Sequence, residues 1–515
     1  MPVIDVAKFD LERLTRMNFG EVIRLLEHVK CEVEEDLGDR LKLEVTHDRP
    51  DHFSAEGLAR TLKGVAGVEV GLPKIRLSAS SIRLEASHIE ERPYISMAVV
   101  RGVRLDDEAV RQLIQLQEKL HETYGRGRRK IAIGYYDVSK IKPPIRYVRI
   151  SQDDEYTPLG FDKPIKVKEM YEATEQGRKY SHLINRERPP ALVDSLDQIM
   201  VVIPVLGSEC CKITDRSRDV LIDVTGTDPN AVTSALSILI YSLLERSETR
   251  EVEVVQGGLT YVHRYVTIRT DEREVGSLLG VDITREDFVK YIAMARFGYQ
   301  EGTVVVPPYR PNVLSWVDVA EEVAVMMGYN QFPREVPKIQ SAGKRHRVEI
   351  LTQEARKILL SMGFMEMNNY ILADEAVEEI CKPARVANPM SELYSVVRCS
   401  IITQLIATAA LVKRREIKLF EIGDVVRGGK TRRVAALLIS RDGVTLTDGL
   451  SAVKALCHRL GLNCHFAEMS TAWALPGRVA EIKGDVEGYV AETSPDLLVK
   501  FKYGMPTVVA ELYIG

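Results

Sequence analysis

The segment Tyr309-Arg-Pro-Asn-Val-Leu-Ser-Trp-Val-Asp-Val-Ala-Glu-Glu-Val-Ala-Val-Met-Met-Gly-Tyr329 carries the strongest local signals in the chain. Ser315 is a good N-cap residue, and Asp318 three positions later resembles the second member of a capping box. Gly328 suits the end of a helix. An apolar stripe at helical spacing lies between them, formed by Val319, Val323 and Met326. The segment therefore predicts an amphipathic helix that begins after Ser315.

Three carboxylates share one face of this predicted helix, because Asp318, Glu321 and Glu322 are spaced i, i+3 and i+4. Like charges at this spacing repel by roughly a few tenths of a kcal/mol per pair, which favours a compensating cation. Mg²⁺ is a natural candidate, since it binds oxygen ligands and usually takes one or two carboxylates plus water. Alternatively, the acids only offset the positive end of the helix dipole. Spacing alone leaves both interpretations open.

Bulk composition indicates an ordinary globular protein with several domains. A chain of 515 residues is too long for one hydrophobic core and suggests three or four domains. Its net charge of −4 gives no global attraction to nucleic acid, so any RNA contact would use a local basic patch or a partner. The aromatic content of 6% also argues against a stacking surface for single strands.

Cysteine usage and the chain start favour a cytoplasmic protein without a membrane segment. Seven scattered cysteines do not form a recognisable disulfide framework. Cys457 and Cys464, each followed by a histidine, match no standard zinc spacing and are interpreted as small apolar residues. No signal peptide pattern is present at the start, and no apolar run reaches the roughly 18 residues that span a bilayer.

Motifs along the first half of the chain indicate alternating strands and helices. Helical periodicity covers 10–29, and strand alternation covers 41–45. A turn, His47-Asp-Arg-Pro-Asp-His-Phe-Ser54, then feeds a helix. Farther on, the loop Tyr124-Gly-Arg-Gly-Arg-Arg-Lys130 is the strongest basic cluster. It is interpreted either as an RNA or phosphate contact or as a solvated hairpin.

The acidic segment resembles the β subunit of phenylalanyl-tRNA synthetase, in which Arg-x-Asp, five residues and Asp-x-x-Glu-Glu-Val-Ala precede Gly-Tyr. The resemblance implies Mg²⁺ ligands at four positions. Three of them keep the family residue, and Asn312 replaces the first aspartate of the pattern. An amide oxygen can coordinate but carries no charge, so affinity should be weaker. The expected ligand set is Asn312, Asp318, Glu321 and Glu322.

Further motifs in chain order resemble the same family, in its archaeal and eukaryotic type. Ala191–Ser195 and Leu221–Asp228 resemble its domain that hydrolyses tyrosine mischarged onto tRNA. Such editing is needed because tyrosine adds only a hydroxyl to phenylalanine, which an apolar pocket rejects weakly. The family pattern Pro-Pro-Ile-Ile-Asn-Ser is Ile203-Pro-Val-Leu-Gly-Ser208 here, without the asparagine and one proline. Ser208 and Asp223 are the expected editing residues, whereas an alternative has Asp223 only closing a turn.

The C-terminal part resembles a class II synthetase core, an antiparallel sheet flanked by helices. Arg398 follows a predicted strand and could hold an ATP phosphate with bidentate geometry. The second requirement, a glycine-rich segment with a closing arginine, is missing from the ending around Tyr503–Leu512. Adenylation by this chain is therefore not expected.

Together these motifs predict an α+β multidomain chain with four parts. They are an N-terminal α/β domain (1–75), a mixed α/β editing-like domain (76–262), a small helical and strand domain with the acidic helix (263–338), and a non-catalytic class II core-like domain (346–515). The resemblance implies a catalytic α subunit as partner in an (αβ)₂ assembly that uses ATP to attach phenylalanine to tRNA(Phe). Two alternatives are a non-enzymatic RNA-binding or assembly paralogue and a stand-alone editing hydrolase.

Overall fold

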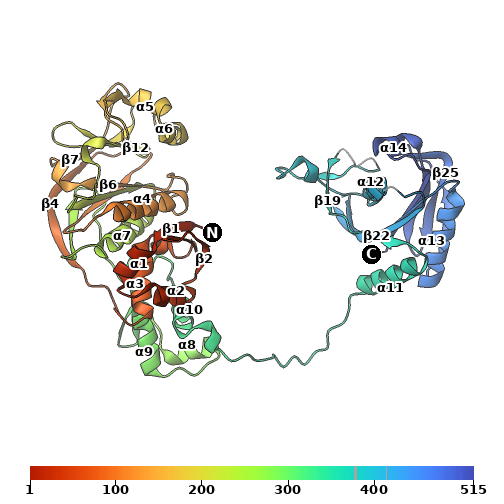
Figure 1. Cartoon of the computed structure of the whole chain (residues 1–515), viewed down its shortest axis with the longest axis horizontal. Helices are drawn as coiled ribbons and strands as arrows, with labels where there is room; N and C mark the ends of the chain where they lie inside the picture. Colours follow the sequence, from red (N-terminus) through yellow and green to blue (C-terminus); the bar gives the residue numbers. More distant parts are fainter. Residues whose placement is uncertain (376–379, 413, 515) are drawn as a thin grey trace. The chain divides into compact units, whose positions relative to one another are not determined.

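The computed structural model describes residues 1–375, 380–412 and 414–514, and its internal contacts divide the chain after Glu335 into two units (Figure 1). Helices and strands are mixed in both units, which confirms the predicted α+β multidomain class. The finer division into four parts stays a prediction. Among the described residues, no helix has the length and apolar character needed to cross a membrane.

The first unit begins with a three-stranded antiparallel sheet in the order β1-β3-β2, packed with three helices. The predicted helical stretch 10–29 is interrupted, because Arg16 adopts a left-handed conformation (φ 60°) that ends the first helix. The elements are β1 (Val3–Ala7), α1 (Lys8–Thr15), α2 (Phe19–Leu26), β2 (Cys31–Asp36), β3 (Arg40–Val45) and α3 (Ala55–Val65).

A nine-stranded sheet follows, in the order β12-β11-β10-β7-β4-β14-β5-β13-β6. Strand β4 runs parallel to both β7 and β14, and the other neighbours are antiparallel. The strands are β4 (Arg76–Ala86), β5 (Tyr94–Val100), β6 (Ile131–Asp137), β7 (Ile145–Arg149), β10 (Pro190–Val193), β11 (Ile199–Val202), β12 (Leu206–Gly207), β13 (Val220–Gly226) and β14 (Glu251–Gln256). The helices are α4 (Asp107–Glu122), α5 (Val167–Ala173), α6 (Glu175–Tyr180) and α7 (Pro229–Leu244), beside the small pair β8 (Glu155–Tyr156) and β9 (Ile165–Lys166).

Strand β13 is buried on both faces, and its alternation decides which side chains reach a functional site. Val220, Ile222 and Val224 belong to the core that also contains apolar residues of α7, and α7 contacts β13 and β5. Because successive strand residues point to opposite faces, Asp223 and Thr225 point away from that core. A buried strand that places two polar side chains on one face calls for a polar partner there.

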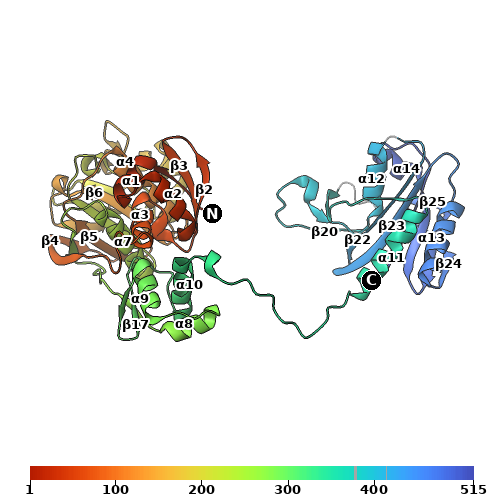
Figure 2. The ribbon, with the colours of Figure 1, turned by 60° about the horizontal axis from the view of Figure 1, so that its bottom comes forward.

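The small domain at the end of the first unit contains three helices and a three-stranded antiparallel sheet, β15-β17-β16. Figures 1 and 2 both show α8, α9 and α10 gathered in one group, and α10 contacts both other helices. The predicted acidic helix is α10, and its Ser315–Asp318 capping box is present. The elements are β15 (Val266–Arg269), α8 (Glu272–Leu279), α9 (Arg285–Met294), β16 (Gly298–Gln300), β17 (Thr303–Val306) and α10 (Trp316–Met327).

The second unit is organised around a seven-stranded sheet in the order β18-β22-β23-β27-β26-β25-β24, with only the β18–β22 pair parallel. Strand β23 carries Ala435, Leu437 and Ile439 into one core, which includes residues of α11 and α13. It carries Ala436 and Leu438 into another, which includes residues of α12 and α14. Both faces of the sheet are therefore covered by helices.

The elements of this unit are α11 (Arg347–Ser361), β18 (Met365–Glu366), β19 (Leu372–Ala373), β20 (Ala384–Arg385), β21 (Val396–Val397), α12 (Ile402–Val412), β22 (Ile417–Arg427), β23 (Lys430–Ser440), α13 (Leu446–Leu460), β24 (Cys464–Glu468), β25 (Ala474–Gly484), β26 (Glu487–Thr493), α14 (Pro495–Lys500) and β27 (Thr507–Tyr513). The strand predicted over 365–371 is limited to β18, and β19, β21 and β20 form a separate three-stranded sheet.

The interpretation of the cysteines was wrong in the second unit. Cys381 is bonded to Cys399, and Cys457 is bonded to Cys464. The second pair joins the end of α13 to the start of β24, across a sequence separation of only 7 residues. Sequence reasoning missed both pairs because the spacing of scattered cysteines does not reveal which of them the fold brings within bonding distance.

Removal of these disulfides should lower the stability of the second unit selectively. Cross-links that close loops of 18 and 7 residues restrict the unfolded chain, which corresponds to about 2–3 kcal/mol each. We expect Cys381→Ser/Cys399→Ser and Cys457→Ser/Cys464→Ser to accelerate hydrogen exchange of the β23 and β27 amides, and reductant to do the same to the unmodified chain. Cys210→Ser, at a thiol that is free in the structure, is the control. Unchanged exchange in both double variants would contradict the prediction.

Candidate functional site

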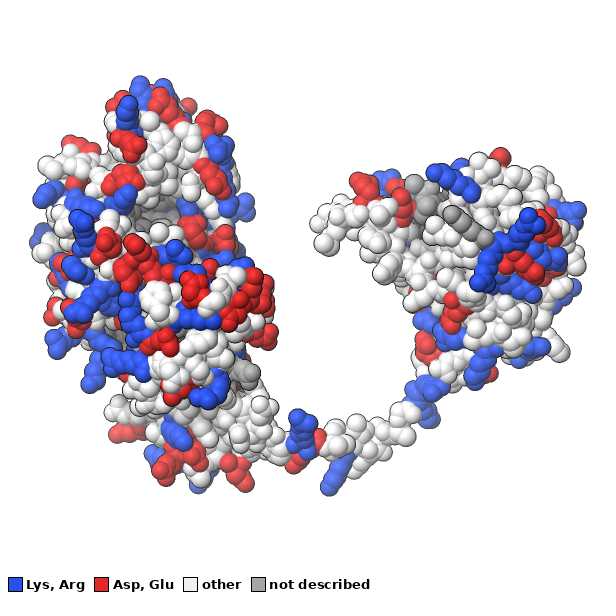
Figure 3. All heavy atoms as spheres, viewed as in Figure 1, with Lys and Arg blue, Asp and Glu red and all other residues white. Residues whose placement is uncertain are grey.

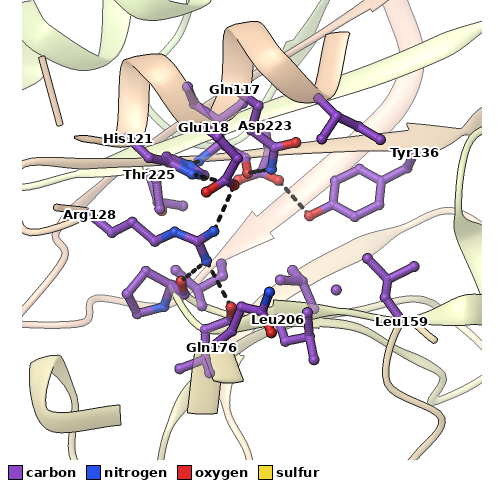
Figure 4. Close-up of a pocket in the computed structure, with 18 residues that line it drawn as sticks. Gln117, Glu118, His121, Arg128, Tyr136, Leu159, Gln176, Leu206, Asp223 and Thr225 are labelled. Atoms are coloured by element: carbon purple, nitrogen blue, oxygen red, sulfur yellow. Dashed lines mark hydrogen bonds and ion pairs between the residues drawn. The ribbon is translucent and has the colours of Figure 1, made fainter. Parts of the chain in front are cut away.

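A cavity of about 330 Å³ is lined by helix α4, by β6 and β13 at one end of the nine-stranded sheet, and by the β11–β12 segment at its other end (Figure 4). Its walls come from elements that are far apart in the sequence. Its polar lining residues are Gln117, Glu118, His121, Arg128, Tyr136, Gln176, Asp223 and Thr225. Its apolar wall includes Leu159, Val201 and the segment from Ile203 to Leu206. The cavity therefore combines an apolar wall with a small number of converging polar groups, as small-ligand sites do.

The hydrogen bond between Tyr136 and Asp223 forms the floor of this cavity. The Tyr136 hydroxyl donates to Asp223 Oδ1 across 2.6 Å, and both side chains are buried. Gly134, which pairs with Asp223 across β6 and β13, leaves the space for this bond. A Cβ at position 134 would lie 2.2 Å from the tyrosine oxygen and 2.3 Å from the carboxylate. Glycine is required here by close approach rather than by backbone conformation.

Burial determines the protonation of Asp223. It raises the pKa of Asp223 from its ordinary value of 3.8 to about 7, although the Tyr136 hydrogen bond and the charge of Arg92 oppose the shift. The group is thus poised to exchange a proton near neutral pH. A carboxyl group of this kind in a cleft is a candidate for substrate binding or acid–base work.

A second polar group closes another side of the cavity, and its centre is Arg128. Arg128 Nη1 donates to the carbonyls of Pro204 (3.0 Å) and Val205 (2.8 Å), and Nη2 donates to Glu118 Oε1 (2.8 Å). His121 also contacts Glu118, with 3.2 Å between Nδ1 and Oε1. Burial would raise the pKa of Glu118, but His121 and Arg128 outweigh it and lower that pKa to about 2. Arg128 therefore connects α4 to the β11–β12 segment through hydrogen bonds and an ion pair (Figure 4).

Arg92 supports this arrangement from behind. Its guanidinium donates to the carbonyl of Arg128 (2.9 Å) and to the carbonyl of Thr225 (3.1 Å). Arg92 is buried, and this burial lowers its pKa to about 10. Arg92 therefore holds the loop that carries Arg128 against strand β13, which carries Asp223.

The structure separates the two predicted editing residues. Ser208 lines a neighbouring cavity of about 190 Å³ that shares Tyr136, Leu159 and Gly207 with the first. The Ser208 hydroxyl donates to the carbonyl of Thr157 (3.0 Å) and accepts from the Cys210 backbone N–H (3.4 Å). It starts a short 3₁₀ turn, and its oxygen is occupied by backbone groups. Asp223 and Ser208 thus line two adjoining cavities, and an editing role for either residue stays a prediction.

The four expected magnesium ligands do not converge in this structure. Both carboxylate oxygens of buried Glu322 accept from Arg310, at 2.6 and 3.2 Å, and Arg310 Nε also donates to Asn312 Oδ1 (3.2 Å). Asp318 Oδ2 accepts from the backbone N–H groups of Leu314 (2.8 Å) and Ser315 (2.7 Å).

Glu321, the remaining expected ligand, forms an ion pair with Lys30. In the described part of the chain, no group of three or more His, Cys, Asp and Glu side chains is arranged to hold a metal ion. The residues present therefore do not fit the expected magnesium site, because partners within the chain already use their oxygens.

Arg398, considered above as a nucleotide contact, is buried inside the second unit. Its guanidinium donates to Glu421 Oε1 (2.6 Å), to the carbonyl of Asp424 (2.9 Å) and to Gln404 Oε1 (2.9 Å). These contacts hold the arginine among protein groups. The expectation that this chain carries no adenylation site stays a prediction.

The basic loop 124–130 is split between two roles. Arg128 points inward to the cavity, whereas Arg126 and Arg129 are exposed, and Lys130 forms an ion pair with Asp228. On the face drawn in Figure 3, blue and red side chains are interspersed over the first unit. The RNA contact predicted for this loop stays a prediction and is limited to the exposed arginines.

Sequence reasoning missed Tyr136, Glu118, His121 and Thr225. Thr225 could have been found, because it lies two residues after Asp223 on the same buried strand and therefore shares its face. Tyr136 lies 87 residues before Asp223 in the sequence. Glu118 and His121 lie on α4, whose periodicity gives no sign of a cavity. Only the sheet order, with β6 beside β13, brings them together.

Comparisons with known proteins agree with this architecture. Residues 268–329 match the family described as "tRNA synthetase B5 domain", and residues 332–514 match "Phenylalanyl tRNA synthetase beta chain CLM domain". The phenylalanine–tRNA ligase beta subunit of Pyrobaculum aerophilum is 70% identical over 515 residues, with 100% of both chains covered. That of Methanocaldococcus jannaschii is 33% identical, also with 100% of both covered.

Among solved structures, an N-terminal fragment of the phenylalanyl-tRNA synthetase β-subunit from Pyrococcus horikoshii matches 64% of this chain and 100% of the fragment. The TM-score is 0.59 at 31% identity. Fold, domain matches and full-length similarity define the chain as a subunit of an aminoacyl-tRNA synthetase. Within that class it belongs to the phenylalanine–tRNA ligase beta-subunit family.

Proposed function

We propose that this chain supports the ATP-dependent attachment of phenylalanine to tRNA(Phe) as the non-catalytic partner of an α subunit in an (αβ)₂ assembly in the cytoplasm. We also propose that it hydrolyses tyrosine mischarged onto that tRNA. Family membership over the full length supports the first part. The Asp223 cavity is the observation that carries the second.

The second unit supports a scaffold role in this proposal. Its seven-stranded, largely antiparallel sheet covered by helices fits the predicted class II core. Arg398, the candidate phosphate contact, is ion-paired to buried Glu421, so a nucleotide would have to displace an internal salt bridge. Adenylation is accordingly assigned to the α subunit.

The chemistry of the first-unit cavity suits the recognition of a hydroxyl group. An apolar wall accepts an aromatic ring, and the Asp223 carboxylate, at the floor, accepts a hydrogen bond from the tyrosine hydroxyl or from the attacking water. A site built to hydrogen-bond a hydroxyl discriminates strongly against the analogue that lacks it. Hydrolysis would proceed by attack of water on the ester carbonyl, and cleavage of the ester bond would release tyrosine and tRNA.

Arg128 contributes to this function as a positioning residue. It joins the carbonyls of Pro204 and Val205 to Glu118 on α4, and so sets the separation of the two walls. The altered segment from Ile203 to Ser208 lies within this wall.

Co-expression with an α subunit tests the proposal. The αβ complex is expected to charge tRNA(Phe) with phenylalanine and to deacylate Tyr-tRNA(Phe), whereas the purified chain alone should not aminoacylate. Charging by the chain alone would contradict the scaffold assignment. A chain that binds tRNA without forming a charging complex would favour the non-enzymatic paralogue, and deacylation of Tyr-tRNA(Phe) by the chain without α would favour a stand-alone hydrolase.

A further inference from the structure

The acidic helix α10 belongs to a family pattern that implies a bound metal, yet its carboxylates meet cations of the chain itself. We propose that Lys30 takes the place of the divalent cation at this helix, beside the Arg310–Glu322 pair, so that the small domain is held to the N-terminal domain by a built-in charge cluster and is independent of magnesium. The argument rests on four side chains and their partners, and does not depend on the editing proposal.

Glu322 is the first of these side chains and is already saturated. It is buried, and its two oxygens are bound by the two terminal nitrogens of Arg310 in a fork-to-fork pair. Arg310 is buried as well, so the two side chains of this ion pair supply each other's counter-charge. Turning Glu322 toward a metal would leave the buried Arg310 guanidinium without its counter-charge, which is strongly unfavourable.

Lys30 takes the position of an external cation for Glu321. It lies at the end of the short 3₁₀ turn Glu27–Val29, in a left-handed conformation (φ 56°). Its ammonium forms ion pairs with Glu321 and, at 3.4 Å, with Asp48. The positive charge of Lys30 therefore lies between Asp48 and Glu321, and Lys30 and Glu321 are 291 residues apart in the sequence.

The other two positions have also changed their role. Asp318 Oδ2 caps the start of α10 through two backbone N–H groups, which gives this carboxylate a local function. Asn312 is neutral and accepts from Arg310, so no fourth negative charge requires compensation. Mg²⁺ demands a near-octahedral set of oxygens that all point at one centre. Here the oxygens point at four different donors.

Metal content and metal-dependent stability of the full-length chain test this inference. After treatment with EDTA and gel filtration, elemental analysis should find far less than one magnesium per chain. Titration with MgCl₂ or MnCl₂, without ATP or tRNA, should shift the melting temperature by less than about 1 °C, since a ligand stabilises only what it binds. Retention of one magnesium per chain, or a saturable rise of several degrees, would overturn the proposal.

Two variants test the role of Lys30 directly. Lys30→Met leaves Asp48 and Glu321 without a cation, so this variant should melt at a lower temperature and should gain a saturable response to MgCl₂. Adding Glu321→Gln should remove that response and recover part of the loss. Lys8→Met, which breaks the Lys8–Asp36 pair elsewhere on the N-terminal domain, is the matched control and should stay insensitive to MgCl₂. A Lys30→Met variant with unchanged melting and no response to MgCl₂ would show that Lys30 does not serve as the cation.

Discussion

Asp223→Asn in the αβ complex is expected to reduce deacylation of Tyr-tRNA(Phe) by about 100-fold or more, the usual effect of removing a group that acts on the reacting proton. Charging with phenylalanine should stay unchanged. The substitution removes the charge but keeps an oxygen that can accept from the Tyr136 hydroxyl, so the floor of the cavity is preserved. The loss would therefore report on the carboxylate itself rather than on folding.

The rate of deacylation should also depend on pH in a direction that the burial of Asp223 determines. Because burial raises the pKa of Asp223 to about 7, the carboxylate form is gained as the pH rises through that value. Deacylation should rise with it, and Asp223→Asn should lack this step. For stability the sign is opposite. The folded state binds the proton more tightly than the unfolded state, so this group costs stability as the pH rises from 3.8 toward about 7.

Two comparisons separate recognition of the tyrosine hydroxyl from activation of water. If Asp223 binds the tyrosine hydroxyl, the variant should lose activity on Tyr-tRNA(Phe) and keep the slow hydrolysis of Phe-tRNA(Phe). If it activates water, both activities should fall together. Asp219→Asn is the matched control, because Asp219 lies just before β13 and pairs with Arg101 outside the cavity. Unchanged deacylation of Tyr-tRNA(Phe) in Asp223→Asn would remove the cavity from the proposed function.

The local features of the acidic helix were predictable from sequence, whereas its chemistry was not. Capping by Ser315 and Asp318 and the apolar stripe depend on residues within one or two turns, and the structure contains both. The counter-ion of Glu321 is Lys30, and no sequence pattern near either residue predicts that contact. Spacing showed that three acids share one face of the helix, but the fold decides what compensates them.

The cavity divides in the same way. Asp223 was found through a family resemblance, and its burial follows from the apolar strand that carries it. Tyr136 on β6 and Arg128 in the loop before it both reach the Asp223 cavity because β6 pairs with β13, which is far along the sequence. Arg128 shows the difficulty best, since a basic loop read from sequence is expected to face solvent, yet this one side chain is buried. The disulfides were missed for the same reason, because the tertiary fold decides which cysteines lie within bonding distance.

A buried charge network in the N-terminal domain should dominate the stability of the first unit. Asp51 is buried, and both of its carboxylate oxygens accept hydrogen bonds. It accepts from Arg49 at 3.0 Å through both of its oxygens and from Arg60 at 3.3 Å. Arg60 also donates to the carbonyl of Tyr241 on α7 and lies 4.0 Å over the ring of Tyr309. Asp51 thus neutralises the arginine that joins α3 to α7 and to the segment leading into α10.

Asp51→Ala is expected to destabilise the first unit by about 3–5 kcal/mol, the cost of leaving buried charges without a partner. Burial would raise the pKa of Asp51, but the charge and hydrogen bonds of Arg49, with His52 and Arg310, outweigh it and lower that pKa far below its ordinary 3.8. The stability that it contributes should therefore be complete above pH 3.8 and be lost as the pH falls below that value. Chemical denaturation of the full-length chain, followed by hydrogen exchange of the α3 and α7 amides, measures the effect.

Asp36→Ala provides the control, because Asp36 pairs with Lys8 at the surface and its loss should have little effect. A second variant, Asp51→Asn, keeps the shape and removes the charge, so it should lose most of the same stability if charge is the cause. If Asp51→Asn is nearly as stable as the unmodified chain, packing rather than charge holds this junction. In that event other acids would compensate the arginines, namely Glu322 for Arg49 and Glu245 for Arg60.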